Sequence, residues 1–263
     1  MQDPILDLDD PDTWHSEFTG LIDSHWCSID AELGATAGTS VWQLMRGEVC
    51  DQNQLGGLLQ KEAVGILCTR YSYVMAYHGC RVRDTVSYTS RGILQSNPAC
   101  LATMARELFC GIDGFDDALR DLTQQWGSGQ SYAQWNHGKV GLLLSGERAR
   151  SERCGFAGGS EFMRAIANRL GKEAKRRFVQ TGRPTLIKCK IPVDWLDMST
   201  TFPVKGSYSN DVLFHLIGKR RDPTANPVAQ NGGYLLTRTV PADHVLNFID
   251  MTDIINDNAW INS

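Results

Sequence analysis

Four short apolar runs, separated by segments with helical spacing, constrain the fold of this chain more than any other feature. They are YSYVMAYH (71–78), GKVGLLL (138–144), TLIKCKIPV (185–193) and YLLTRTVP (234–241). Aromatic content, alternation and a length too short for a typical helix each favour a strand. Strands that alternate with helices and loops predict an α+β fold in one domain, with a mixed sheet.

Helical patterns fill most of the chain between these strands. Segments 85–94, 99–109 and 116–126 have helical spacing, and the first ends at Gly92. Residues 160–178 are predicted as one continuous helix with Ser160 as its N-cap. Residues 210–217 fit either a strand or a short helix, and VLNFIDM (245–251) is a last apolar element.

The part before the first strand is predicted to be helical. From Trp14 to about Leu67, apolar residues at helical spacing are interrupted by glycines, which favours several short helices. Residues 1–13 carry five aspartates and two prolines, so we expect a solvated lead-in with little structure of its own. The domain is therefore expected to span residues 14–263.

Charge and cysteine usage exclude several classes of protein. A net charge of −4 argues against coating of nucleic acid, although KEAKRRF (172–178) and GKRR (218–221) are either solvated surface or a local phosphate-binding patch. The eight cysteines form no CxxC and no metal-ligand spacing, which disfavours a zinc site. No signal-peptide pattern and no membrane-length apolar run occur, so we expect a cytoplasmic protein that does not contact membranes.

The stretch AYHGCRVRDTVSYTSRGIL (76–94) is the first candidate site. His78, Gly79 and Arg81 follow the first predicted strand, where a chain often turns toward a cleft. The structural alternative is that His78 caps the strand and that Arg81 pairs with Asp84 on the surface.

The stretch CGFAGGSE (154–161) is the second candidate site. Three glycines in five residues allow backbone N–H groups to approach an anion or a ligand closely. The sequence does not match a P-loop, a GxGxxG motif or a GxSxG elbow. Glu161 follows at the first helical position, where the helix dipole favours a carboxylate whatever its function.

The order of the motifs resembles ADP-ribosyltransferase-like domains of the diphtheria-toxin and poly(ADP-ribose) polymerase branch. The resemblance is carried by YHGCR…RGIL, GKVGLLLS, RPTLIKCKIPVDWLD and GGYLLTRTVPADHV, and covers about residues 71–255. It implies a mostly antiparallel split sheet, preceded by a helical part over about 14–70. It also implies NAD as substrate and transfer of ADP-ribose to a protein or nucleic acid, or NAD hydrolysis. Such domains often act as toxins or defence effectors, which allows for an antitoxin or another regulatory partner.

The resemblance also implies roles for individual residues. His78 would hydrogen-bond a ribose, Gly79 would let the nicotinamide amide reach the backbone, and Arg81 would pair with the pyrophosphate. The family places a tyrosine in the second strand, but GKVGLLLS has none. Tyr132 precedes this segment and Tyr88 is near the first strand; we assign Tyr88, and with it Ser160, to the NAD site.

The catalytic acid departs from the family pattern. The family's glutamate begins the closing strand, where this chain has Gln230 and Gly233. Cleavage of the nicotinamide–ribose bond passes through an oxocarbenium-like state that a nearby carboxylate stabilises, and Glu161 is the predicted substitute. The alternative is a non-catalytic module that binds a nucleotide or a partner protein. A hydrolase that uses scattered Ser, His and Asp residues has no motif in support.

Overall fold

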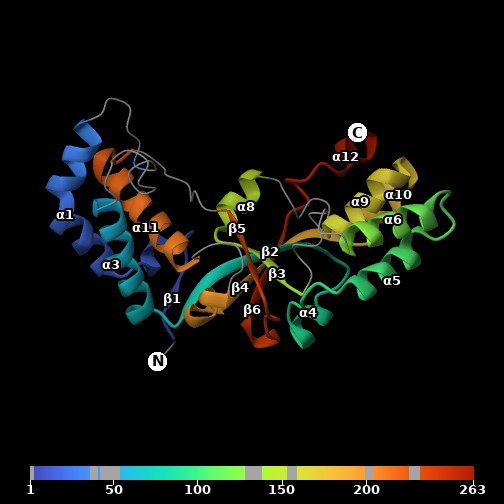
Figure 1. The fold of residues 1–263 in the computed structure, drawn as a ribbon, viewed down its shortest axis with the longest axis horizontal. Helices are drawn as coiled ribbons and strands as arrows, with labels where there is room; N and C mark the ends of the chain where they lie inside the picture. The colour runs from blue at the N-terminus through green and yellow to red at the C-terminus, as the bar shows by residue number, and fades with distance from the viewer. Residues whose placement is uncertain are drawn as a thin grey trace.

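A mostly antiparallel sheet crosses the middle of the protein, and helices gather at both of its ends (Figure 1). The computed structural model describes residues 3–35, 41, 54–127, 138–152, 159–198, 204–224 and 232–263. Its strands are β1 (Ile5–Leu6), β2 (Tyr73–Val82), β3 (Val140–Leu143), β4 (Arg183–Pro192), β5 (Gly233–Leu236) and β6 (Val245–Asp250). The predicted α+β fold with a mixed, mostly antiparallel sheet and a helical N-terminal part is confirmed.

The sheet separates into two parts beside β2. The described strands lie in the order β5-β3-β2-β4-β6, and β1 pairs with β2 in parallel. β2 pairs with β4 along its whole length, from Tyr73↔Pro192 to Val82↔Arg183. By contrast, β3 pairs with β2 only at Tyr77↔Leu143 and then continues beside β5. The edge of β2 beyond Tyr77 is therefore unpaired by any described strand on the β3 side.

One helical group packs on the N-terminal end of β2. It consists of α1 (Ser16–Ala35), α3 (Gln54–Arg70) and α11 (Val204–Arg221), with the 3₁₀ turn η2 (Val193–Met198) beside them. The prediction of several short helices is wrong for residues 16–35 and 54–70, which form two long helices. Gly20, Gly34, Gly57 and Gly65 lie inside them, and a Cβ at any of these positions would meet no atom within 4 Å, so no packing contact requires glycine there. Residues 210–217, left open between strand and helix, belong to α11.

The acidic lead-in is part of the fold, so the prediction of a structureless segment is wrong. Leu6 is fully buried in the main core, and β1 extends the sheet. The buried Asp7 carboxylate accepts a hydrogen bond from Lys188 Nζ at 2.7 Å. Asp9 accepts hydrogen bonds from Ser145 Oγ at 2.5 Å and from the Gly146 N–H at 2.7 Å. The partners of these aspartates lie far away in the sequence, so local composition cannot reveal them. The 3₁₀ turn η1 (Pro11–Thr13) follows.

A second helical group has its own apolar core at the other end of the sheet (Figure 1). Its members are α5 (Pro98–Phe109), α6 (Phe115–Gly127), α9 (Glu161–Leu170), α10 (Lys172–Val179) and α12 (Asp257–Asn262). The predicted continuous helix over 160–178 is wrong, because Gly171, at φ 84°, separates α9 from α10. A glycine in this region of φ acts as a helix terminator. The C-terminal helix α12 was not predicted.

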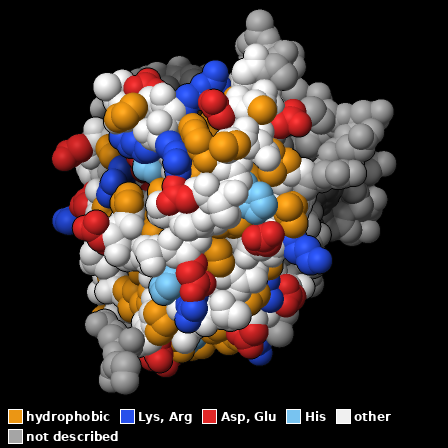
Figure 2. Space-filling model, turned by 90° about the vertical axis from the view of Figure 1, so that its left-hand side faces the viewer, with side chains coloured by type: hydrophobic (Ala, Val, Ile, Leu, Met, Phe, Trp, Pro, Cys, Tyr) orange, Lys and Arg blue, Asp and Glu red, His pale blue; other side chains and the backbone are white. Residues whose placement is uncertain are grey.

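Three cations of the two basic runs make contacts within the protein. Lys175 is buried in α10, and Arg177 pairs with Glu173. Arg220, near the end of α11, pairs with Asp23 and lies over the Trp26 ring. Figure 2, which faces the end formed by α1, α3 and α11, shows acidic and basic side chains intermixed. In the described parts of the chain, no helix is long and apolar enough to cross a membrane.

Two shorter helices and a third 3₁₀ turn connect the sheet to its surroundings. They are α4 (Val86–Arg91), α8 (Gly146–Glu152) and η3 (Ala242–His244). α4 confirms the helix predicted to end at Gly92, which has φ 76° and precedes the Ile93↔Val240 bridge. A Cβ at Gly92 would lie 1.9 Å from the Val240 carbonyl oxygen.

Gly92→Ala should therefore destabilise the protein by about 3 kcal/mol or more, because the strain of positive φ adds to a backbone clash. Gly111→Ala is the matched control: Gly111 has φ 81°, but an added Cβ meets nothing within 4 Å. We expect that control to lose roughly 1 to 2 kcal/mol, the cost of the conformation alone. Urea unfolding measures both, and equal losses would show that the contact with Val240 does not matter.

Candidate functional site

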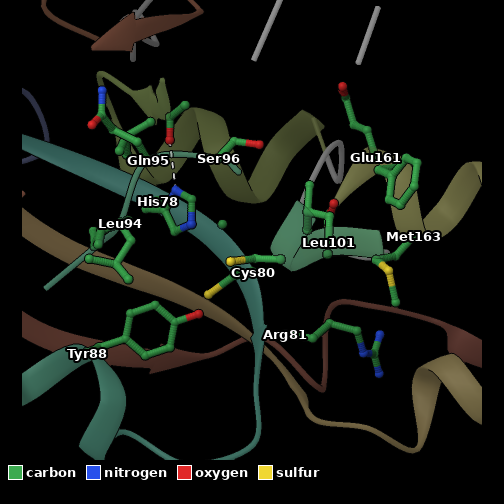
Figure 3. Close-up of a pocket in the computed structure, with 18 of the residues that line it drawn as sticks. His78, Cys80, Arg81, Tyr88, Leu94, Gln95, Ser96, Leu101, Glu161 and Met163 are labelled. Atoms are coloured by element: carbon green, nitrogen blue, oxygen red, sulfur yellow. Dashed lines mark hydrogen bonds between the residues drawn. The ribbon is translucent and has the colours of Figure 1, made fainter. Parts of the chain in front are cut away.

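A cavity of about 1000 Å³ opens where β2 and β3 separate. Its walls come from β2, β3, β5, α4, the α4–α5 link, α5 and the start of α9. All six residues predicted from the sequence line it: His78, Gly79, Arg81, Tyr88, Ser160 and Glu161. The two candidate stretches, about 80 residues apart in the chain, therefore contribute to one cavity (Figure 3).

His78 bridges the gap between the two parts of the sheet. It follows Tyr77, the residue of β2 that pairs with β3, and its Nδ1 lies 2.8 Å from the Gly141 carbonyl oxygen of β3. A carbonyl can only accept, so Nδ1 carries the proton in this bond. In a neutral imidazole, Nε2 is then left with a free lone pair. His78 lies in the middle of the cavity lining shown in Figure 3.

The surroundings of His78 favour its neutral form. Burial lowers the pKa of its imidazole below the ordinary value of 6.5, although the bond to the Gly141 carbonyl acts in the opposite direction. At neutral pH the ring is thus a fixed hydrogen-bond acceptor in the cavity rather than a cation.

Tyr88 and Cys80 form a second polar contact in the cavity wall. The Tyr88 hydroxyl is directed toward the Cys80 sulfur (Figure 3). Burial raises the pKa of the Cys80 thiol to about 12 and raises that of Tyr88 as well. Both groups therefore remain protonated and neutral. The Tyr88 ring also packs edge-on against Phe248 of β6, which fixes its position.

Arg81 lines the cavity, but its guanidinium is engaged by groups of the protein. Its side chain is only 4% exposed, and its Nη1 and Nη2 atoms donate to the Asp257 carboxylate at 2.9 and 2.7 Å. Its Nε and Nη2 donate further to the carbonyls of Gly182 and Val179. The alternative of a surface pair with Asp84 is also wrong, because the Asp84 carboxylate caps α4 by accepting from the N–H groups of residues 86 and 87.

Glu161 lies on the opposite side of the cavity from Tyr88 (Figure 3), and Ser160, which precedes it, also belongs to the lining. Ser160 is at the N-cap position of α9, but its side chain makes no capping hydrogen bond. Glu161 is exposed, and its side chain is turned away from His78. Desolvation by nearby protein atoms raises the pKa of Glu161, while the Arg164 cation lowers it.

The start of β5 cannot supply the missing carboxylate. Gly233 pairs with Leu143, and a Cβ at this position would lie 2.8 Å from the Leu142 carbonyl oxygen. Only glycine fits against β3 here. Gln230, the other residue at the family's glutamate position, lies outside the described residues, as does Tyr132.

Sequence reasoning missed three cations that line the cavity: Arg83, Arg91 and Lys139. Arg83 and Arg91 are exposed. Within the described residues, neither Arg91 nor Lys139 forms an ion pair. The described lining also contains two carboxylates, Asp84 and Glu161. Arg81 is left out of this comparison of charges because Asp257 neutralises it. Arg83 and Arg91 lie within the first candidate stretch, 76–94, although neither was selected there, whereas Lys139 reaches them only through the fold.

No metal centre is formed by the described residues, which contain no group of three or more His, Cys, Asp or Glu side chains that could hold an ion. Comparison with known proteins gives no match to a family model, to a curated protein or to a solved structure. The chemistry of the cavity therefore has to be argued from its own residues.

The titration of His78 should appear in the stability of the protein. Because its folded pKa lies below its unfolded value of 6.5, its contribution to stability is complete above that value and is lost as the pH falls through the folded pKa. His78→Asn, which keeps a donor for the Gly141 carbonyl, should reduce the loss of unfolding free energy between about pH 7.5 and about pH 5.5.

Urea unfolding at the two pH values measures this difference. His25→Asn, on α1 and away from the cavity, is the control for removing one imidazole. An unchanged pH dependence in His78→Asn would show that this histidine titrates as it does in the unfolded chain.

Proposed function

We propose that the cavity binds NAD and that the protein cleaves the nicotinamide–ribose bond, transferring ADP-ribose to a macromolecule or to water. The observation that carries the proposal is the opening of the sheet at His78, where a neutral imidazole and a strand edge that no described strand pairs face one cavity. The order of motifs in the sequence resembles ADP-ribosyltransferase-like domains and supports the same chemistry.

The edge of β2 suits the nicotinamide group. An unpaired strand edge presents N–H and C=O groups, and a carboxamide offers one donor group and one acceptor to match them. Gly79 lies on this edge and has no side chain to block the approach of a flat ring. The free Nε2 of His78 would accept a hydrogen bond from a ribose hydroxyl beside it.

The charge of the lining suits a dinucleotide. Arg83, Arg91 and Lys139 give the cavity an excess of positive charge in a chain whose net charge is −4. A pyrophosphate is attracted to such a site, and arginine can meet its oxygens with two parallel hydrogen bonds. These three residues replace Arg81 as the proposed phosphate ligands.

Glu161 is the carboxylate proposed to stabilise the positive ribose in the transition state. Asp84 and Glu161 are the two carboxylates of the described lining, and Asp84 is engaged as the cap of α4. The Glu161 side chain is exposed at the start of α9, so rotation about its own bonds can redirect the carboxylate. A carboxylate near the developing charge need not attack it covalently.

The alternative is a non-catalytic module that binds a nucleotide or a partner protein in the same cavity. Two observations favour it: Gly233, at the start of β5, leaves no room for an acidic side chain, and Glu161 is turned away from His78. Binding without turnover would support this alternative.

The decisive experiment incubates the protein with NAD labelled in the nicotinamide ring and measures release of free nicotinamide. NAD labelled in the adenylate part then shows whether ADP-ribose is attached to protein, to RNA or to neither. We expect Glu161→Gln to lower nicotinamide release about a hundredfold or more, because a stabilising charge is lost from the transition state.

Glu107→Gln is the matched control, because Glu107 is an exposed glutamate of α5 outside the cavity lining. Full release by Glu161→Gln would exclude Glu161 as the essential carboxylate. If the wild type releases no nicotinamide, calorimetric titration with NAD separates the binding module from a protein that does not recognise NAD.

A further inference from the structure

The C-terminal helix α12 lies beside α9 and α10 (Figure 1), and α9 begins with Glu161 of the cavity lining. Two of its side chains, Asp257 and Trp260, make contacts that lead to the first turn of α9. Neither contact is between neighbours in sequence, and neither has a part in the function proposed above.

The first contact is the ion pair of Asp257 with Arg81. Both oxygens of the carboxylate accept from the planar fork of the guanidinium, at 2.9 and 2.7 Å. The same guanidinium donates to the carbonyls of Val179 and Gly182, at 3.0 and 3.2 Å. This arrangement ties α12 to β2 and to the turn between α10 and β4, with little freedom for the arginine to move.

The stem of Arg81 continues this contact to the turn before α9. Gly159, at φ 64°, packs so closely that a Cβ there would lie 3.3 Å from Arg81 Cγ and 3.1 Å from Phe178 Cζ. Glu161 follows two residues later as the first residue of α9. Displacement of Arg81 would therefore remove the surface on which this turn rests.

The second contact is made by the Trp260 ring. The guanidinium of Arg164 lies 5.8 Å from its centroid and Lys175 Nζ lies 5.6 Å from it, while Phe178 meets it edge-on. Lys175 Nζ also donates to the Trp260 carbonyl at 3.2 Å. Arg164 is on the first turn of α9, where its charge acts on the Glu161 carboxylate.

We propose that α12 is a positioning element for the cavity: Asp257 acting through Arg81, and Trp260 acting through Arg164, hold the start of α9 and with it the Glu161 carboxylate. The inference rests on the proposed function, in which Glu161 is the catalytic residue. Asp257 and Trp260 do not line the cavity, so they are positioning residues rather than catalytic ones.

A rival interpretation makes the opposite prediction. Asp257 could be an internal anion that occupies Arg81 until the phosphates of NAD displace it, and its removal would then increase NAD affinity. The burial of Arg81 and its two bonds to carbonyls argue for a permanent structural contact. The sign of the effect of Asp257→Asn separates the two interpretations.

The first test measures nicotinamide release by Asp257→Asn, with Asp253→Asn as control. Asp253 is exposed in the same segment and accepts no hydrogen bond from the described residues. We expect Asp257→Asn to lower kcat about tenfold with KM for NAD changed less than about twofold, because the carboxylate is misplaced while the NAD-binding groups are intact. Trp260→Ala should act in the same direction, and Trp260→Phe should restore most of the rate because it keeps an aromatic face for the cations.

The second test does not depend on catalysis. Amide hydrogen exchange in residues 164–168, the first amides of α9 with helical acceptors, should become faster in Asp257→Asn but not in Asp253→Asn, while exchange in α3 stays unchanged and reports global stability. Faster exchange in a protein that never releases nicotinamide would reject the proposed function but support the mechanical contact.

Three results would overturn the inference. They are unchanged exchange at the start of α9, an unchanged kcat in Asp257→Asn, and a rise in NAD affinity in that variant. The last of these would establish Asp257 as an internal competitor of the phosphates.

Discussion

The cavity depends on the hydrogen bond between His78 Nδ1 and the Gly141 carbonyl. It spans the place where β3 leaves β2 after one residue pair, so a side chain takes over where backbone pairing ends. A carbonyl left without a partner in this position would carry a desolvation penalty of about 1 to 3 kcal/mol. The same bond fixes the tautomer of His78 and turns the free Nε2 lone pair toward any ligand in the cavity.

Polar contacts made by residues near the two ends of the chain hold the two parts of the sheet in place. Asp7, next to β1, reaches Lys188 on β4, and Asp9 binds Ser145 and Gly146 directly after β3. The N-terminal aspartates thus fix β4 and the exit of β3 from one side. At the other side, Arg81 and Asp257 fix the end of β2 to the second helical group. The cavity lies between these two sets of polar contacts.

Local chemistry was enough to predict much of the fold. Aromatic and alternating runs gave β2, β3 and β4, and Gly92 marked the end of α4. The sequence also selected six residues that prove to line one cavity. Contacts between residues far apart in the chain could not be predicted from the sequence. Arg81 and Asp257 are 176 positions apart, and no pattern around either residue identifies its partner. The sequence therefore located Arg81 beside the cavity but could not show that Asp257 pairs with its guanidinium.

The location of the proposed carboxylate on a helix has a physical consequence. A side chain on β5 would be held by the backbone pairing of β5 with β3, but Gly233 leaves no room for one there. A residue at the start of α9 is held instead by side-chain contacts, namely the stem of Arg81 against Gly159 and the cation of Arg164 against Trp260. Such contacts are individually weaker than a strand ladder and can be altered by single substitutions far from the cavity. Under the proposed function, the reactivity of this site is therefore set as much by α12 as by the strands that form its walls.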